Sequence, residues 1–120
     1  MPDKYCNYNK KNTFSNCFWL FFELTGTGTE WLDIGLPTPT LFIKTPFGAY
    51  VAYAIEGFFA TEKNKKFLAD IFIRLKLSFA NENASIRIIP YPPNLDNLPD
   101  YAILIEKVYN LRDDIAPALV

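Results

Sequence analysis

The stretch Cys17-Phe-Trp-Leu-Phe-Phe-Glu-Leu-Thr25 decides the fold, because it is a nearly unbroken run of apolar and aromatic residues. Apolar and polar side chains do not alternate along it, which is typical of a strand that is buried on both faces. Glu23 interrupts the run well before the roughly 20 apolar residues that a membrane-spanning helix needs. The stretch therefore predicts a central strand of a covered sheet and no transmembrane segment.

Two further apolar segments predict a hairpin. Residues 40–44 and 49–55 are rich in aliphatic and aromatic side chains, and only Thr45-Pro-Phe-Gly48 separates them. A connection this short joins neighbouring antiparallel strands. Between the first strand and the hairpin, residues 30–35 are expected to form a short helical turn with Thr29 as its cap.

Residues 61–80 carry the clearest helical pattern, with Thr61 as a suitable N-cap. The helix has five basic and two acidic side chains, a net charge of +3. These charges are those of a solvated helix face, and the alternative is a local stripe that faces DNA. The residues predicted to form the buried face are Phe67, Leu68, Ile71, Phe72, Leu75 and Phe79.

The rest of the chain completes an α+β domain. Residues 85–89 predict a fourth strand, and residues 99–109 predict a last helix with Leu104, Ile105, Val108 and Leu111 facing inward. We therefore expect a single α+β domain over residues 17–120, preceded by a polar N-terminal arm at residues 1–16. Its sheet should be mixed or mostly antiparallel, with about four strands packed by a long amphipathic helix and a C-terminal helix.

Composition excludes several classes of function. The 120 residues have a net charge of −1 and a pI of about 5.3, so any contact with nucleic acid must come from a local patch. Without histidine, the chain lacks imidazole bases and most types of zinc site. Cys6 and Cys17 are expected to be reduced thiols, and the polar start of the chain carries no signal peptide, so a cytoplasmic protein is expected.

Individual residues give weak support for catalysis. Cys17 has no histidine to activate it, and burial in a strand would raise the pKa of its thiol. Gly26-Thr-Gly28 lacks the lysine and hydroxyl residue that complete a phosphate-binding loop. Glu23 is the one acid inside a strand, and it is the candidate metal ligand.

Three blocks between Phe18 and Pro93 resemble the core of the archaeo-eukaryotic primase superfamily, in particular the primase-like replication proteins of plasmids and viruses. The first block is the strand that ends in Glu23. The second runs from Leu36-Pro-Thr-Pro-Thr40 through Ile43-Lys-Thr-Pro-Phe-Gly48 into the strand that ends at Glu56. The third is the amphipathic helix followed by Ala80-Asn-Glu-Asn-Ala-Ser-Ile-Arg-Ile-Ile-Pro-Tyr-Pro92.

The departures from the family pattern fall on its catalytic positions. Where the family has two metal-binding aspartates one residue apart, this chain has Glu23 and Thr25. Tyr50 stands at the place of the family's histidine, and the third acid is replaced by Asn81, with Glu82 beside it. Because two-metal phosphoryl transfer needs anionic ligands, these replacements argue against polymerase activity and leave Glu23 and Glu82 as the candidate catalytic residues.

The resemblance therefore implies a degenerate, primase-like replication domain that binds nucleic acid or a replication protein and needs no cofactor. The candidate nucleic-acid-binding residues are Tyr50, Lys66, Arg74, Arg87 and Tyr91, which would supply base stacking and phosphate contacts. Single-stranded DNA or RNA, replication proteins and a second copy of the chain are the candidate partners, and a membrane is not.

Two alternatives stay open beside this interpretation. One is an active nucleotidyltransferase that uses Mg²⁺ or Mn²⁺ with Glu23, Glu82 and a shifted acid such as Asp33 or Glu56. The other is a protein-interaction module unrelated to replication, for example a small homodimer that buries its aromatic excess. In either case Tyr50 and Tyr53 fall on opposite faces of their strand, so at least one of them is expected in the core.

Overall fold

The computed structural model describes residues 17–57, 61–79, 83–89, 96 and 98–119. The predicted N-terminal arm, Glu82 and Tyr91 lie outside these residues. The elements, in chain order, are β1 (Cys17–Thr25), α2 (Glu30–Ile34), β2 (Leu41–Thr45), β3 (Gly48–Glu56), α3 (Glu62–Ser78), β4 (Asn83–Ile89), β5 (Ile103–Leu104), β6 (Val108–Tyr109), the π-helical turn η2 (Leu111–Ile115) and the 3₁₀ turn η3 (Ala116–Ala118).

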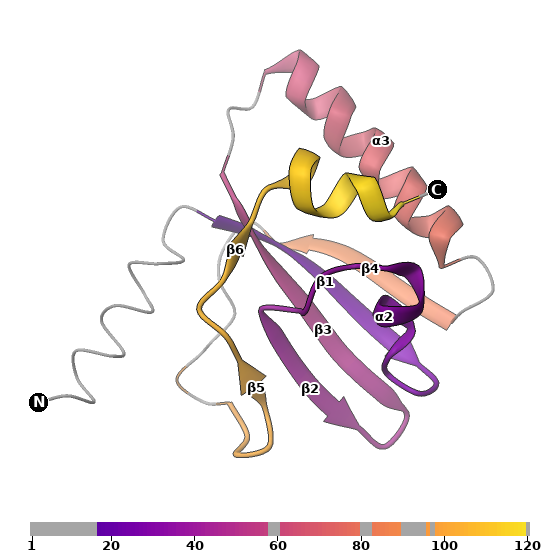
Figure 1. The fold of residues 1–120 in the computed structure, drawn as a ribbon, viewed down its shortest axis with the longest axis vertical. Coiled ribbons are helices and arrows are strands. Elements are labelled where there is room, and N and C mark those ends of the chain that lie inside the picture. The colour runs from indigo at the N-terminus through magenta and orange to yellow at the C-terminus, as the bar shows by residue number, and fades with distance from the viewer. Residues whose placement is uncertain (1–16, 58–60, 80–82, 90–95, 97, 120) are drawn as a thin grey trace, which may run out of the picture.

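The strands form one sheet in the order β4-β1-β3-β2-β5, and every neighbouring pair in this order is antiparallel (Figure 1). β6 adds a short parallel pairing to β3, beyond the end of β2. From β1 to β4 the chain follows the split β-α-β pattern, in which β1 separates β4 from β3. The predicted antiparallel hairpin, the central place of β1 and the α+β class are confirmed.

One side of the sheet carries the larger core. Alternate residues of β1 and β3, among them Phe22 and Tyr53, pack there against Ile71 and Leu75 of α3. η2 and η3 cover the same side and lie beside α3 (Figure 1). The predicted buried face of α3 is confirmed, because Ile71, Leu75 and Phe79 are buried and its other members are half-buried.

The other side of the sheet has a smaller core at one end. Trp19 and Ala54, from β1 and β3, are fully buried there. Leu104 and Val108 of the C-terminal segment pack over them. β1 is therefore covered on both faces at its start, as the apolar run predicts, whereas farther along the strand Phe21 is half-buried and Glu23 and Thr25 are exposed.

α3 begins as predicted, because the Thr61 hydroxyl accepts a hydrogen bond from the Asn64 backbone N–H at 3.2 Å. Along α3, the Arg74 guanidinium lies 3.8 Å from the Asp70 carboxylate, and the Lys65 ammonium lies 3.9 Å from the Glu62 carboxylate. Among the described residues, no helix combines the length and the apolar character that crossing a membrane requires.

The helix predicted over residues 99–109 is wrong. That segment forms β5 and β6, and the helical turns follow it at residues 111–118. The β-branched and aromatic residues Ile103, Val108 and Tyr109 favour extended backbone, and β2 and β3 offer edges with which they can pair. Pairing with these strand edges satisfies backbone hydrogen-bonding groups of the segment. The apolar spacing of the sequence does not show that such edges are present.

Tyr53 gives the protein a predicted sensitivity to alkali. Its hydroxyl donates to the Pro37 carbonyl at 2.8 Å inside the larger core, and burial raises the pKa of this phenol above 10. In the unfolded chain tyrosine ionises near pH 10, so stability is fully present below that pH and falls as pH rises above it, by about 1.4 kcal/mol per pH unit for one such group.

Tyr53→Phe should therefore flatten the dependence of unfolding free energy on pH above about pH 10. At neutral pH the same variant should be about 1 kcal/mol less stable, because the hydrogen bond to Pro37 is lost. Urea unfolding at a series of pH values measures both effects, and a slope equal to that of the unmodified protein would contradict the assignment.

Candidate functional site

The open part of the sheet carries a small group of aromatic, aliphatic and acidic side chains. Phe21 and Glu23 of β1, Ile43 of β2 and Tyr50 of β3 lie on the side opposite α3, and we call them the open-face patch. Phe21, Ile43 and Tyr50 are half-buried, and Glu23 is exposed. The patch lies next to the smaller core, at the end of the sheet that β5 and β6 leave less covered.

Strand register brings the members of the open-face patch together. Tyr50 is the direct partner of Glu23 on one side and of Ile43 on the other. Phe21 is the diagonal neighbour of Tyr50, and their ring centroids are 5.6 Å apart with 35° between the ring planes. Direct cross-strand neighbours on one face have Cβ atoms about 5 Å apart, so the Glu23 carboxylate is within reach of a group that rests on Tyr50.

The other predicted nucleic-acid-binding residues differ in their positions, and Tyr91 lies outside the described residues. Arg87, in β4, is the register partner of Phe21, so its backbone borders the patch. Lys66 and Arg74 belong to α3, on the opposite side of the sheet. The predicted division between the two tyrosines of β3 is confirmed, because Tyr53 is buried in the larger core.

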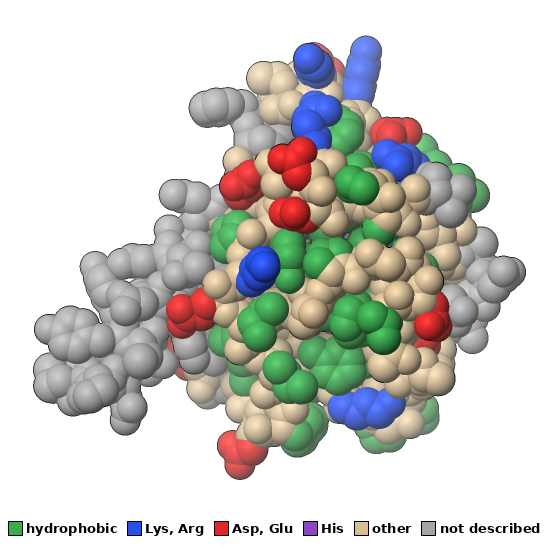
Figure 2. All heavy atoms as spheres, viewed as in Figure 1, with side chains coloured by type: hydrophobic (Ala, Val, Ile, Leu, Met, Phe, Trp, Pro, Cys, Tyr) green, Lys and Arg blue, Asp and Glu red, His purple; other side chains and the backbone are tan. Residues whose placement is uncertain are grey.

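Arg74 has a structural role in this arrangement. Its guanidinium donates to the carbonyls of Ala116 at 3.0 Å and Leu119 at 3.4 Å, and thus ties the last turns to α3. Figure 2 shows basic side chains gathered over α3 at the top of the view, with acidic side chains close below them. The basic charge of α3 is therefore locally balanced on this face, which favours the interpretation of a solvated helix.

The glycine-threonine loop after β1 is built around a buried acid. Glu30 is 5% exposed, and its two carboxylate oxygens accept hydrogen bonds from the Thr27 hydroxyl at 3.0 Å and the Gly28 backbone N–H at 3.3 Å. The Lys44 ammonium donates to the Thr27 carbonyl at 2.9 Å. The loop thus turns its donors inward to a carboxylate of the chain itself, which explains the glycines and threonines without a phosphate ligand.

Glu30→Gln is expected to destabilise the protein by about 1–2 kcal/mol, because an amide replaces one of the two accepting oxygens in a buried site. The matched control is Glu62→Gln, which removes an exposed carboxylate on α3 and should change stability by less than about 0.5 kcal/mol. Urea unfolding followed by circular dichroism compares the two variants. Equal stabilities would show that Glu30 does not hold the loop.

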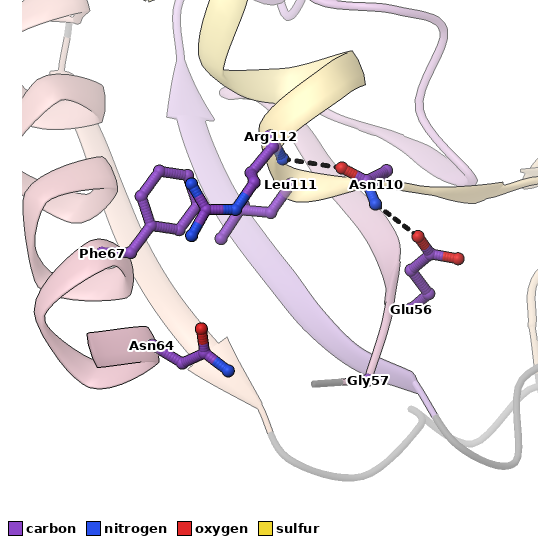
Figure 3. A pocket seen from close by; sticks show the side chains of 7 residues that line it. All are labelled: Glu56, Gly57, Asn64, Phe67, Asn110, Leu111 and Arg112. Carbon is purple, nitrogen blue, oxygen red and sulfur yellow. Dashed lines mark hydrogen bonds between the residues drawn. The ribbon is translucent and has the colours of Figure 1, made fainter. Parts of the chain in front are cut away.

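A pocket of about 100 Å³ lies between the start of α3, the end of β3 and the start of η2 (Figure 3). The Arg112 guanidinium lies 4.0 Å from the centre of the Phe67 ring, and the Asn110 side-chain amide donates to the Glu56 carboxylate. The Asn110 side-chain oxygen also accepts from the backbone N–H groups of Arg112 and Asp113, so it caps η2. These contacts fasten the C-terminal turns to β3 and α3.

The sequence named Glu56, Phe67 and Leu111 in other roles, and it did not predict this pocket or the contacts of Asn110 and Arg112. Asn110 precedes a short apolar and charged segment, which is an N-cap signal that could have been recognised. The stacking of Arg112 on Phe67 joins residues far apart in the chain, and no local pattern encodes it. The pocket explains how the C-terminus is held rather than what the protein binds.

Metal and thiol chemistry gain little support from the described part of the chain. No group of three or more Cys, Asp or Glu residues that could hold a metal ion occurs there. Glu23 is therefore the one carboxylate of the open-face patch, and the second candidate, Glu82, lies outside the described residues. Cys17 is buried, and burial followed by the nearby Glu56 charge raises the pKa of its thiol, so it is protonated at neutral pH.

The protein is therefore an α+β domain with a split β-α-β sheet. Helices cover one face of this sheet, and the open-face patch lies on the other face. Comparisons with protein-family models, with curated proteins and with solved structures gave no match. Function must therefore be argued from the site itself.

Proposed function

We propose that this chain is a catalytically inactive, primase-like replication domain of a plasmid or virus, which acts in the cytoplasm and holds single-stranded DNA or RNA. The single-stranded nucleic acid would lie across the open-face patch, on the side of the sheet opposite α3. The proposal combines the resemblance of three sequence blocks with the position of the patch on a split β-α-β sheet.

The single observation that carries the proposal is the aromatic pair of Phe21 and Tyr50, with ring centroids 5.6 Å apart on the less covered face. Aromatic side chains on neighbouring central strands of a four-stranded sheet are a recurrent platform on which unstacked bases rest. Stacking of this kind tolerates any base, because every base has a π-face. Arg87 remains the candidate for a phosphate contact, because its backbone is the register partner of Phe21.

Loss of catalysis is proposed on the chemistry of the metal-binding positions. Glu23 is followed two residues later by the neutral Thr25, and Tyr50 occupies the position next to Glu23 across the strands. Glu23 alone, without the second acid of the family pattern at residue 25, cannot balance the charge of two divalent ions and a triphosphate. Primer synthesis with Mg²⁺ or Mn²⁺ should therefore give no product, and a metal-dependent product that disappears in Glu23→Gln would favour the active alternative instead.

Fluorescence anisotropy of labelled oligothymidylate, its RNA counterpart and a duplex of equal length tests the binding proposal. Saturable binding to the single strands should weaken as salt is raised, because phosphate contacts release counterions. The duplex should bind more weakly, since its bases are not available for stacking. Absence of binding to every probe at low salt would overturn the proposal.

A second candidate function is self-association through α3. Ile73 and Leu77 lie one helical turn apart on its outer side, and each is 57% exposed. Two copies of α3 packed antiparallel about Ile73 would bring Asp70 of each copy close to Lys76 of the other, so the face is complementary to itself. Light scattering tests this candidate: a dimeric mass favours it, and a monomeric mass at high concentration removes it.

A further inference from the structure

We propose that the open-face patch selects guanine among the bases, with Glu23 as the specificity-determining residue. This inference rests on the proposed binding of single strands, and it identifies which base the patch holds. Its basis is the position of one carboxylate directly across from the stacking tyrosine.

The geometry of the aromatic pair determines how a base can rest on the patch. A base inserted between two parallel rings needs them about 7 Å apart, twice the usual contact distance between carbon atoms. The Phe21 and Tyr50 centroids are 5.6 Å apart and the rings are tilted by 35°, so no base fits between them. One base therefore stacks on the outer surface of the pair, and its edge lies over a neighbouring side chain.

Among the side chains that the structure describes, the neighbour with the reach and chemistry to contact that edge is Glu23. It is exposed, and none of the described side chains hydrogen-bonds or pairs with its carboxylate. The other direct neighbour of Tyr50 on this face is Ile43, which is apolar. A phosphate would be repelled by Glu23, so the group that approaches it is a base and not the backbone of the strand.

An ionised carboxylate accepts hydrogen bonds and donates none, so it requires donors on the base. On its pairing edge guanine presents two adjacent donors, the N1–H and the N2 amino group, and a carboxylate can accept from both at once. Adenine and cytosine each place an acceptor nitrogen beside their amino donor, and thymine flanks its one N–H with two carbonyls. Guanine is thus the base whose pairing edge matches Glu23 without a repulsive contact.

The test uses three labelled oligothymidylates that are identical except for one central base: guanine, hypoxanthine or adenine. Hypoxanthine keeps the N1–H of guanine and lacks the N2 amino group, so it removes one of the two hydrogen bonds. Binding should follow the order guanine, hypoxanthine, adenine, with about a tenfold span in Kd, as expected for hydrogen bonds to a charged group. Affinities of the guanine and adenine probes within twofold of each other would overturn the inference.

Two variants separate the specificity from the binding. Glu23→Gln should bring the three probes within about twofold of one another, because an amide replaces one of the two accepting oxygens, and circular dichroism should show that the variant is folded. Glu62→Gln, on α3, removes the same charge elsewhere and should leave the preference for guanine unchanged. If all probes bind equally, only the guanine inference fails; if no probe binds, the proposed function fails with it.

Discussion

Tyr50→Ala is expected to weaken binding of single-stranded DNA by about 5- to 150-fold, since stacking of a base on an aromatic side chain contributes about 1–3 kcal/mol. Tyr50 is half-buried at the centre of the open-face patch, where it contacts Phe21 and lies between Glu23 and Ile43 in register. Its removal takes away the platform while leaving the buried cores in place. Anisotropy titrations at fixed salt measure the change in Kd.

The matched control for this prediction is Tyr101→Ala. Tyr101 is 65% exposed and precedes β5, outside the open-face patch, so its loss should leave Kd within about twofold of the unmodified protein. Circular dichroism and urea unfolding should show that both variants are folded. If the two variants lose affinity equally, binding does not take place on the patch.

Gly48→Ala is expected to lower the free energy of unfolding by about 3 kcal/mol or more. A Cβ atom at this position would lie 1.9 Å from the carbonyl oxygen of Leu24, a backbone atom that cannot rotate away. Gly48 pairs with Thr25 at the end of β1 and with Thr45 in the hairpin, so a shift would disturb three strands at once. Close approach of another backbone is a known reason for glycine within a strand.

Gly35→Ala provides the comparison. Gly35 ends α2 in the left-handed region at φ 98°, and nothing lies within 4 Å of a Cβ added there. The variant therefore suffers only the conformational penalty, about 1–2 kcal/mol. Thermal and urea unfolding of both variants should rank Gly48→Ala as clearly the less stable, and an equal loss in both would mean that crowding at Gly48 is not the cause.

Much of the fold could be predicted from the sequence because its local signals agree with the final packing. The run around Phe22 has no polar alternation and becomes the central strand, and the apolar spacing around Ile71 becomes the buried face of α3. The failure lies at residues 99–109, where apolar spacing suited a helix and β propensity suited a strand. Pairing with the edges of β2 and β3 favours the strand over the helix, and those edges exist only in the folded sheet.

The candidate site could be predicted only in part, for a related reason. Tyr50 and Glu23 were recognised individually, yet their pairing depends on the register between β1 and β3. Phe21 was not singled out, because in a continuous apolar run it looks like any core residue. Its spacing of two from Glu23 was the available signal, since residues two apart in a strand share a face.

The position of β3 has a consequence for how the molecule opens. β3 pairs with β1 along its whole length. The other edge of β3 pairs first with β2 and then with β6. Amide hydrogens of β3 that pair with β1 and β2 should therefore exchange with solvent only when the entire domain unfolds, whereas the two-residue strands β5 and β6 can detach by local fluctuation. Motions that expose Trp19 and Ala54 thus begin in the C-terminal segment and leave the platform around Tyr50 intact.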